Sequence, residues 1–266
     1  MRRPAAAAVV LAVLGFGACR EAQDARPSPS STAPRLEGTI TVSAASSLTD
    51  VFTRIGAQFT RAHPGARGTF NFGSSAVLAT QIQQGAPVDT FASADTTTMS
   101  NLAGAGLLSG APHVFARNRL VIVTPPGNPR GIRGLADLAD AGTVALCAAT
   151  APCGRYAAQV LAAAGVAIPE ASVTRGVDAR ATIASVTTGD ADAAVVYVTD
   201  AAAAGAAVST VRIPDAVNAI AVYPIATLRG ARAPSVSRAF VAALLSRRSQ
   251  AVLRKAGFLP AASPTP

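Results

Sequence analysis

The sequence predicts an α/β fold with two lobes, each a mostly parallel sheet flanked by helices, and a ligand cleft between the lobes. Short apolar strand patterns alternate with helical patterns along the chain, which favours parallel sheets with right-handed crossovers. Residues 193–198 form a continuous apolar run, as strands buried on both faces do. The alternation breaks at residues 112–118 and then resumes, which indicates a second series of units.

The first series starts with a strand at residues 39–42 and the helix that follows it. Apolar residues recur in this helix every three to four positions, the period of an α-helix with one buried face. They are Leu48, Val51, Phe52, Ile55 and Phe59, and the pattern stops at His63-Pro64-Gly65.

Two further strands complete this series, at residues 69–72 and 89–93. Between them, Leu78 and Ile82 face inward on a short helix that ends at Gly85-Ala86-Pro87. Asp95 stands where a helix N-cap is expected, because its carboxylate can accept a hydrogen bond from an unpaired helical N–H group.

The second series leads into two terminal helices. It has strands at 120–123, 143–146 and 193–198, helices near 135–138, from Gly154 and at 178–188, an extended segment near 223–225, and terminal helices at 235–245 and 248–255. The terminal helices can return to the first lobe. We therefore expect lobe 1 to comprise residues 38–117 and 223–262, and lobe 2 to comprise residues 118–222.

The N-terminus predicts export. Arg2 and Arg3 precede an apolar segment, residues 5–17, that has the length of a signal peptide and is too short to span a bilayer. Small residues before Cys19 resemble a lipobox, which predicts a lipoprotein signal peptide over residues 1–19 and a lipid on Cys19. An ordinary secretory signal with an incidental cysteine is the alternative. Residues 20–37, rich in serine and proline, predict a flexible tether to the cell membrane.

The remaining cysteines, Cys147 and Cys153, are six residues apart with Pro152 between them. In an exported and therefore oxidising setting, a disulfide between them is the favoured interpretation. Two free thiols, or half of a metal site, are the alternatives, although no histidine lies near them in the sequence.

The basic charge balance does not indicate nucleic-acid binding. The formal net charge is +9, and removal of residues 1–19 with Arg2 and Arg3 leaves +7. The arginines are scattered, only 5% of residues are aromatic, and tryptophan is absent, so platforms for base stacking are scarce. The charge instead predicts weak steering of anions.

Helices of the predicted fold begin with small or hydroxyl residues directly after strands. Helix N-termini present unpaired N–H groups and a partial positive charge, so several of them around one cleft form an anion site without a cation. Ser47 and Ser75 follow the first two strands, which we expect to be neighbours. Both hydroxyl groups would then point into the same opening of the predicted cleft. Cys153 and Ala179 would contribute backbone N–H groups at two later helix starts. These features predict capture of a small oxyanion.

Each of these residues also has a simpler interpretation. Ser47 and Ser75 stand at positions where a serine ordinarily caps a helix. Tyr197, near the carboxyl end of a buried strand, needs a partner for its hydroxyl group. That partner is either a buried carbonyl group or a ligand in the cleft.

Five segments, in order and at compatible spacing, resemble the molybdate-binding proteins of bacterial ABC importers. They are Ala-Ala-Ser-Ser-Leu-Thr-Asp at 44–50, Phe-Gly-Ser-Ser at 72–75, Gly-Ala-Pro-Val-Asp-Thr-Phe-Ala-Ser-Ala-Asp at 85–95, Pro-Cys-Gly-Arg-Tyr at 152–156 and Val-Val-Tyr-Val-Thr-Asp at 195–200. Ala256-Gly257-Phe258 resembles the C-terminal ending of that family. The likeness covers about residues 38–260.

The resemblance implies a periplasmic-binding-protein-like fold whose lobes close on molybdate or tungstate. It places the ligand serines of the family on Ser47 and Ser75, its backbone donors on Cys153 and Ala179, and its ligand tyrosine on Tyr197. The metal would be bound only as its oxyanion, with no cofactor and no catalytic residue. The implied partners are the membrane subunits of an ABC permease, and we expect a monomer.

An exported serine hydrolase is the main alternative from another class. Its serine would need a base, and His63 and His113 are the only histidines. The sequence contains no Gly-x-Ser-x-Gly motif and no cluster of metal ligands. A nearer alternative is the same fold with sulfate or phosphate as the ligand. A ferric complex would require more than the three tyrosines present.

Overall fold

The structure is a computed structural model, and it describes residues 35–262. The predicted signal peptide with Cys19, and residues 20–34 of the predicted tether, lie outside the described residues. Residues 35–37 have no regular secondary structure, and the first strand begins at Gly38. A search of the described residues finds no helix that is both long and apolar enough to cross a membrane.

The strands form one sheet in the order β2-β1-β3-β9-β4-β7-β5-β6, with β8 paired to β4. A group of parallel strands stands at each end of it. The first group is β1 (Gly38–Ala45), β2 (Ala66–Gly73) and β3 (Thr90–Ala92), and the second is β5 (Val144–Cys147), β6 (Val173–Gly176) and β7 (Ala193–Tyr197).

Two long strands join the groups. β9 (Ile220–Thr227) pairs antiparallel with β3, and β4 (His113–Thr124) pairs antiparallel with β9 along its first half and with β7 along its second half. The short strand β8 (Ser209–Arg212) also pairs with the second half of β4. β4 and β9 are therefore the strands through which the two groups are connected.

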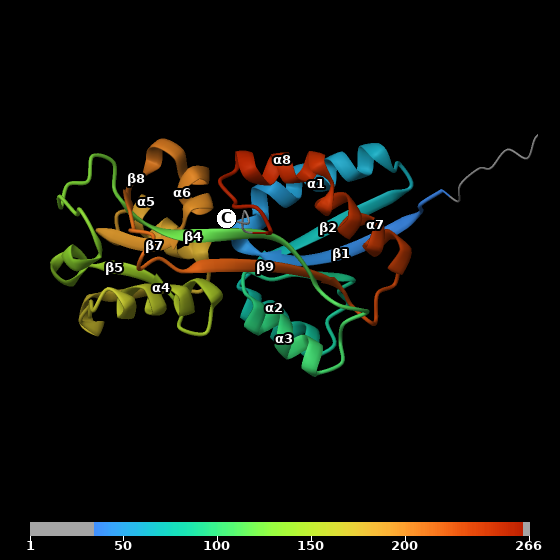
Figure 1. The fold of residues 1–266 in the computed structure, drawn as a ribbon, viewed down its shortest axis with the longest axis horizontal. Coiled ribbons are helices and arrows are strands. Elements are labelled where there is room, and N and C mark those ends of the chain that lie inside the picture. Colours follow the sequence, from blue (N-terminus) through green and yellow to red (C-terminus); the bar gives the residue numbers. More distant parts are fainter. Residues whose placement is uncertain (1–34, 263–266) are drawn as a thin grey trace, which may run out of the picture. The chain divides into compact units, whose positions relative to one another are not determined.

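Helices cover both faces of each group (Figure 1). In lobe 1, which contains the first group, α1 (Thr49–Ala62), α7 (Pro234–Leu245) and α8 (Arg247–Lys255) lie on one face, and α2 (Ser75–Gln83) and α3 (Thr96–Gly104) lie on the other. In lobe 2, which contains the second group, α4 (Pro152–Ala163) covers one face, and α5 (Ala179–Thr187) and α6 (Val198–Ala204) cover the other. Within residues 35–262 there are also four 3₁₀ turns: Ser46–Leu48, Leu135–Asp140, Glu170–Ser172 and Gly205–Ala207.

This arrangement confirms the predicted α/β fold class. The parallel pairing holds within each end group, whereas every pairing made by β4 and β9 is antiparallel. The predicted lobe limits, after residue 117 and before residue 223, fall inside these two strands. Those limits remain a prediction.

The predicted break at residues 112–118 is wrong, because β4 begins at His113. Phe115 and Ala116 are buried in this part of the strand, but the polar residues Arg117 and Asn118 interrupt the apolar run that would have indicated it. The helix α6 and the strand β8 were also not predicted. The sequence of α6 is rich in alanine and shows no apolar periodicity, and β8 has only four residues.

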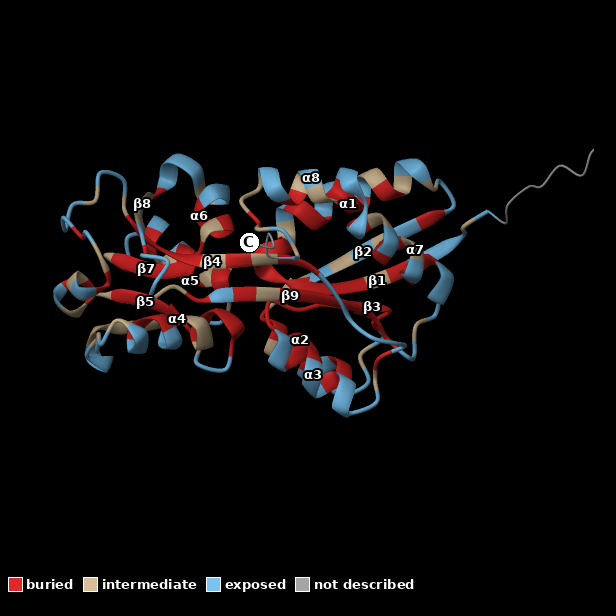
Figure 2. Ribbon diagram, viewed as in Figure 1, coloured by how far each residue is buried: buried red, intermediate tan, exposed pale blue. Residues whose placement is uncertain are grey.

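The sheet and the inner faces of the helices form the core, and the outer helix faces are exposed (Figure 2). Phe52 on α1 lies at the centre of an aromatic cluster, with its ring centroid 5.7 Å from that of Phe115 and 6.0 Å from that of Phe240. This packing fixes α1, and with it the turn from β1 to α1, against β4 and α7. The lobe-1 side of the site described below is therefore rigidly supported.

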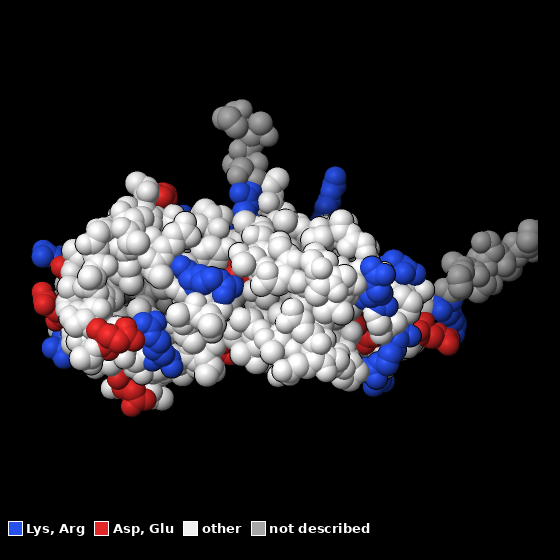
Figure 3. All heavy atoms as spheres, turned by 90° about the horizontal axis from the view of Figure 1, so that it is seen from below, with Lys and Arg blue, Asp and Glu red and all other residues white. Residues whose placement is uncertain are grey.

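Basic side chains are dispersed over the face shown in Figure 3, with acidic side chains among them. They do not gather into a stripe of the kind that binds nucleic acid.

Candidate functional site

A pocket between the two lobes brings together all five residues that the sequence predicted as ligand-binding. It is lined by Ala45, Ser46, Ser47, Gly73, Ser74, Ser75, Ala94, Ala151, Pro152, Cys153, Asp178, Ala179 and Tyr197. Among these described lining residues there is no lysine, arginine or histidine. Apart from the carboxylate of Asp178, these lining residues present neutral groups to the pocket.

Ser47 and Ser75 occupy equivalent positions after two neighbouring strands. The last residue of β1, Ala45, stands in register with the last residue of β2, Gly73. Each serine lies two residues beyond its strand, Ser47 in the 3₁₀ turn that leads to α1 and Ser75 as the first residue of α2. The parallel register thus places both hydroxyl groups at the same edge of the sheet.

Cys153 lies at the start of α4, directly after Pro152, which is the first helical residue. Proline has no N–H group, so the first N–H that this helix presents is that of Cys153. A disulfide joins Cys147, the last residue of β5, to Cys153. A Cβ on Gly154 would overlap the carbonyl oxygen of Ala148, so glycine is required for the helix start to pack this closely on the preceding loop.

Ala179 is the first residue of α5. The preceding Asp178 caps this helix by accepting a hydrogen bond from the backbone N–H of Ala181 at 3.0 Å. The cap satisfies the third N–H of the helix. The N–H of Ala179, a lining residue of the pocket, has no intrahelical acceptor and is therefore available to a ligand.

Tyr197 ends β7 and immediately precedes α6. Its side chain is buried, yet its hydroxyl group has no hydrogen-bond partner within the part of the chain that the structure describes. Burial raises the pKa of Tyr197 well above its usual value, so the group is a neutral donor at physiological pH. A buried hydroxyl group without a partner is costly, and a ligand in the pocket would supply the missing acceptor.

The two serine oxygens already accept hydrogen bonds or lie within range of a donor. The Ser75 Oγ accepts one from the backbone N–H of Ala94 at 3.0 Å. The Ser47 Oγ lies 2.9 Å from the hydroxyl oxygen of Tyr223, which belongs to β9 and is fully buried. Tyr223 does not line the pocket, and sequence reasoning assigned it no role.

Two arginines beside the pocket are paired with carboxylates of the opposite lobe. Arg155 on α4 donates to Asp95, the N-cap residue of α3, from Nε at 3.1 Å and from Nη2. Arg180 on α5 forms an ion pair with Asp50 on α1 at 2.5 Å. Sequence reasoning missed both pairs, because nothing local in the chain indicates contacts across 60 and 130 residues.

Asp200, in the first turn of α6, is fully buried near this site. Neither of its carboxylate oxygens has a hydrogen-bond partner among the described residues. Burial raises the pKa of Asp200 to about 7, and the positive charge of Arg180 opposes this shift. The lobe-2 side of the site thus contains a carboxyl group whose pKa is raised towards neutrality by burial.

The described residues contain no group of three or more His, Cys, Asp or Glu side chains that could hold a metal ion. The site presents hydroxyl and amide hydrogens from both lobes to a small acceptor-rich solute.

A family model described as "Bacterial extracellular solute-binding protein" matches residues 40–259. The chain belongs to this family. Among bacterial extracellular solute-binding proteins with curated names, the molybdate-binding protein ModA of Mycobacterium tuberculosis is 41% identical over 220 residues, which cover 82% of this chain and 84% of that protein.

Two solved structures show the same fold at lower identity. The periplasmic molybdate-binding protein of Azotobacter vinelandii has a TM-score of 0.74 at 21% identity and covers 85% of this chain and 100% of its own. The sulfate-binding protein SubI of Mycobacterium tuberculosis has a TM-score of 0.75 at 18% identity and covers 84% of this chain and 87% of its own. As a bacterial extracellular solute-binding protein, the chain functions outside the cytoplasm and captures a solute.

Proposed function

We propose that this protein captures molybdate or tungstate and delivers it to the membrane subunits of an ABC importer. One observation carries the proposal. Neutral donors from both lobes meet in a pocket without a cation, and one of them, the Tyr197 hydroxyl group, has no partner among the described residues. The 41% identity to ModA supports the choice of oxyanion.

The five proposed ligand residues are Ser47, Ser75, Cys153, Ala179 and Tyr197. Ser47, Ser75 and Tyr197 would donate from their hydroxyl groups, and Cys153 and Ala179 from their backbone N–H groups. A hydrogen bond to a charged group contributes about 1.5–3 kcal/mol, so five contribute on the order of 8–15 kcal/mol before costs. The costs of desolvation and lobe closure offset part of this favourable free energy. The remainder corresponds to about micromolar affinity or tighter.

A site in which donors predominate also selects its anion. A protonated oxyanion such as hydrogen phosphate presents an O–H group, for which the five proposed ligand residues are not arranged as acceptors, and an O–H group left unpaired is costly to bury. Molybdate and tungstate are unprotonated dianions at neutral pH and avoid that cost. Sulfate is equally unprotonated, so the size of the closed pocket must exclude it. Sulfate or phosphate binding by the same fold is the alternative.

Isothermal titration of the chain from residue 20 onward with molybdate, tungstate, sulfate and phosphate tests the proposal. We expect strong heats of binding with molybdate and tungstate and weak or no heat with the two smaller anions. No heat with either large oxyanion, together with clear binding of sulfate or phosphate, would overturn it in favour of the alternative.

The membrane anchor is a separate part of the proposal. The lipobox-like residues before Cys19 support a lipid on that cysteine, with residues 20–37 as the tether and a monomeric binding protein held at the outer face of the cell membrane or in the periplasm. A Cys19→Ser variant is expected to be released from the membrane fraction. A variant that stays anchored would contradict lipidation.

A further inference from the structure

We propose that Asn118 and Tyr223 form a hydrogen-bond relay that fixes the Ser47 hydroxyl group as a donor to the bound oxyanion. The proposal rests on the proposed function, because it concerns the same pocket. It adds two positioning residues that lie behind the pocket lining and act through Ser47.

The three side chains are buried and in contact. The amide nitrogen of Asn118 (Nδ2) lies 3.5 Å from the Tyr223 hydroxyl oxygen, which in turn lies 2.9 Å from the Ser47 Oγ. Asn118 and Tyr223 are each 0% exposed, and Ser47 is 7% exposed. Asn118 lies on β4 and Tyr223 on β9, the two strands that connect the lobes.

The backbone fixes the orientation of the Asn118 amide. Its Oδ1 atom accepts a hydrogen bond from the backbone N–H of Arg119 at 3.0 Å, and a backbone N–H can only donate. The NH₂ group must therefore face the other way. One of its hydrogens is donated to the Thr199 Oγ1 at 2.8 Å, and the other is directed at Tyr223.

The direction of the next bond follows from this. Because the Tyr223 oxygen already accepts from Asn118, we infer that its own hydrogen is donated to its other hydrogen-bond partner, the Ser47 Oγ at 2.9 Å. Burial raises the pKa of Tyr223, so this hydrogen is retained at all physiological pH values. The Ser47 oxygen thus accepts from Tyr223, and the Ser47 hydrogen remains for an acceptor in the pocket.

The Ser75 hydroxyl group is also oriented with its hydrogen towards the pocket, but by a single backbone hydrogen bond. Its Oγ accepts from the backbone N–H of Ala94 at 3.0 Å, so its hydrogen too is left for the pocket. Each serine oxygen therefore accepts one hydrogen bond from the protein, and each hydroxyl hydrogen is left for an acceptor in the pocket. This arrangement favours an unprotonated oxyanion, whose oxygens can all accept hydrogen bonds.

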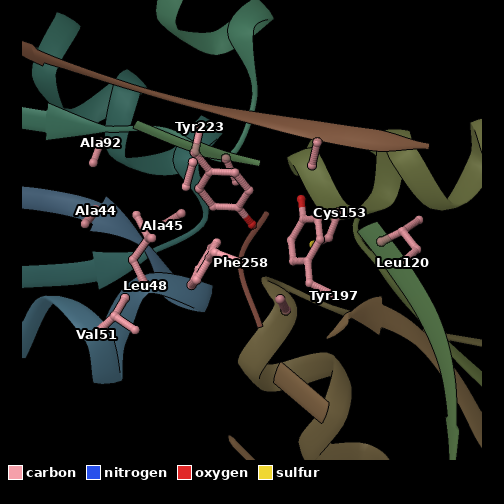
Figure 4. Packing of buried hydrophobic residues seen from close by; sticks show 14 of the residues in the cluster. Ala44, Ala45, Leu48, Val51, Ala92, Leu120, Cys153, Tyr197, Tyr223 and Phe258 are labelled. Atoms are coloured by element: carbon pink, nitrogen blue, oxygen red, sulfur yellow. The ribbon is translucent and has the colours of Figure 1, made fainter. Parts of the chain in front are cut away.

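Packing keeps the Tyr223 ring in place independently of its hydroxyl group. The ring contacts Phe258, Tyr197 and Phe115, with centroid distances of 5.4, 5.9 and 6.2 Å. Figure 4 shows the two tyrosine rings next to each other, with Cys153 beside Tyr197. Tyr223→Phe removes the relay hydrogen and leaves these ring contacts, which makes it a selective test.

The experiment is a pair of double-mutant cycles measured by titration with molybdate. Tyr223→Phe is combined with Ser47→Ala in one cycle and with Ser75→Ala in the other. We expect Tyr223→Phe alone to weaken binding about 5- to 30-fold, the effect of one mispositioned hydrogen bond to a charged group. In the Ser47→Ala protein the same change should have less than a two-fold effect, because the relay has lost its target. In the Ser75→Ala protein its full effect should persist.

Asn118→Asp is a second variant that reverses the relay. A carboxylate at position 118 would accept the Tyr223 hydrogen, and Ser47 would then donate to Tyr223 and not to the ligand. Asp200 titrates in the same pH range, so the variant is compared with the unchanged protein at each pH. The variant should bind more weakly at pH 8.5, and the difference should narrow at pH 6.5, as the acid at position 118 becomes protonated and able to donate. Thermal unfolding of each variant reports whether it is folded.

The outcomes separate this proposal from the proposed function. If the unchanged protein binds molybdate and Tyr223→Phe binds it equally well, the relay is wrong and the site stands. A loss on Tyr223→Phe that is equal with and without Ser47 also overturns the relay, because it would reflect a general structural effect. If molybdate gives no heat, the cycles are run with whichever of tungstate, sulfate or phosphate binds. Absence of binding by all four overturns both proposals.

Discussion

Arg155 of lobe 2 donates hydrogen bonds to Asp95 of lobe 1, with a distance of 3.1 Å between Arg155 Nε and Asp95 Oδ2. Asp95 also caps α3 by accepting from the backbone N–H of Thr98 at 2.9 Å, and it directly follows Ala94, whose N–H group binds Ser75. The ion pair therefore connects the start of α4, which presents the Cys153 N–H, to the segment that holds Ser75. Because the pair joins the two lobes, it can form only when the lobes are together.

The first prediction concerns this pair. Arg155→Gln is expected to weaken molybdate binding by about 1 kcal/mol, the upper range for an ion pair that is partly exposed to solvent. Arg212→Gln is the control, since it removes an exposed ion pair with Asp215 inside lobe 2 and should leave binding unchanged. Titration calorimetry measures the molybdate affinity of both variants. The loss of affinity caused by Arg155→Gln should become smaller at high salt, because salt screens the ion pair.

Asp95→Asn distinguishes the pair from a simple effect of charge. If Arg155 acted only as a nearby positive charge, loss of the Asp95 carboxylate would strengthen binding of a dianion. If the pair holds the lobes together, Asp95→Asn should weaken binding as Arg155→Gln does, while asparagine still caps α3. Stronger binding by Asp95→Asn would contradict the role that we assign to the pair.

The second prediction concerns Tyr197. Tyr197→Phe should weaken molybdate binding by about 1.5–3 kcal/mol, the contribution of one hydrogen bond to a charged group. The melting temperature of the ligand-free protein should stay the same or rise, because the variant removes a buried hydroxyl group that has no partner in the described structure. Unchanged affinity combined with a lower melting temperature would mean that this hydroxyl group serves the fold and not the ligand.

The third prediction is a dependence of stability on pH. Burial raises the pKa of Asp200 to about 7 in the folded protein, from 3.8 for an exposed aspartate. The folded protein therefore holds this proton to higher pH than the unfolded chain does, and stability falls as the pH rises through the interval between the two values. Asp200→Asn removes the titration and keeps a neutral side chain of similar shape.

We expect Asp200→Asn to stabilise the protein at pH 8 relative to the unchanged chain, by on the order of 2–4 kcal/mol more than at pH 5. Denaturant unfolding of both proteins at the two pH values measures this, and the comparison cancels the contribution of every other titrating group. If the free energies of unfolding of the two proteins differ by the same amount at pH 5 and at pH 8, the Asp200 carboxyl group does not titrate in this range.

The fourth prediction concerns the start of α4. Gly154→Ala places a methyl group against the carbonyl oxygen of Ala148, so the helix start, and with it the Cys153 N–H, must move. We expect molybdate binding to weaken at least ten-fold, on the order of 1.4 kcal/mol or more. Gly104→Ala is the matched control, because a Cβ there meets no atom within 4 Å. Equal affinity for both variants would argue against a ligand contact at Cys153.

The lining of the pocket could be predicted from the sequence because its signals are local. Ser47 and Ser75 each follow a strand at a helix start, and Cys153 follows a proline in the same way. Residues at such positions place hydrogen-bond donors at one edge of a parallel sheet, and this placement does not depend on long-range contacts. Tyr197 was identified for a related reason, as a polar group at the end of an apolar strand.

The residues behind the lining could not be predicted in this way. Asn118 and Tyr223 are 105 residues apart and meet only because β4 and β9 pair antiparallel at the junction of the lobes. The sequence around Asn118 was interpreted as a break between units, so the pairing of β4 with β9 was not foreseen. Contacts of this kind depend on how distant strands align, and they leave no periodic pattern in the amino-acid sequence from which they could be predicted.

A crystal structure of the protein with molybdate tests the central claim most directly. We predict that the oxyanion lies in the pocket with its oxygens 2.6–3.2 Å from five donors, the usual range for hydrogen bonds to charged groups. These donors are the Ser47, Ser75 and Tyr197 hydroxyl groups and the Cys153 and Ala179 N–H groups. An oxyanion held instead by arginine or lysine side chains, or bound anywhere outside this pocket, would contradict the account.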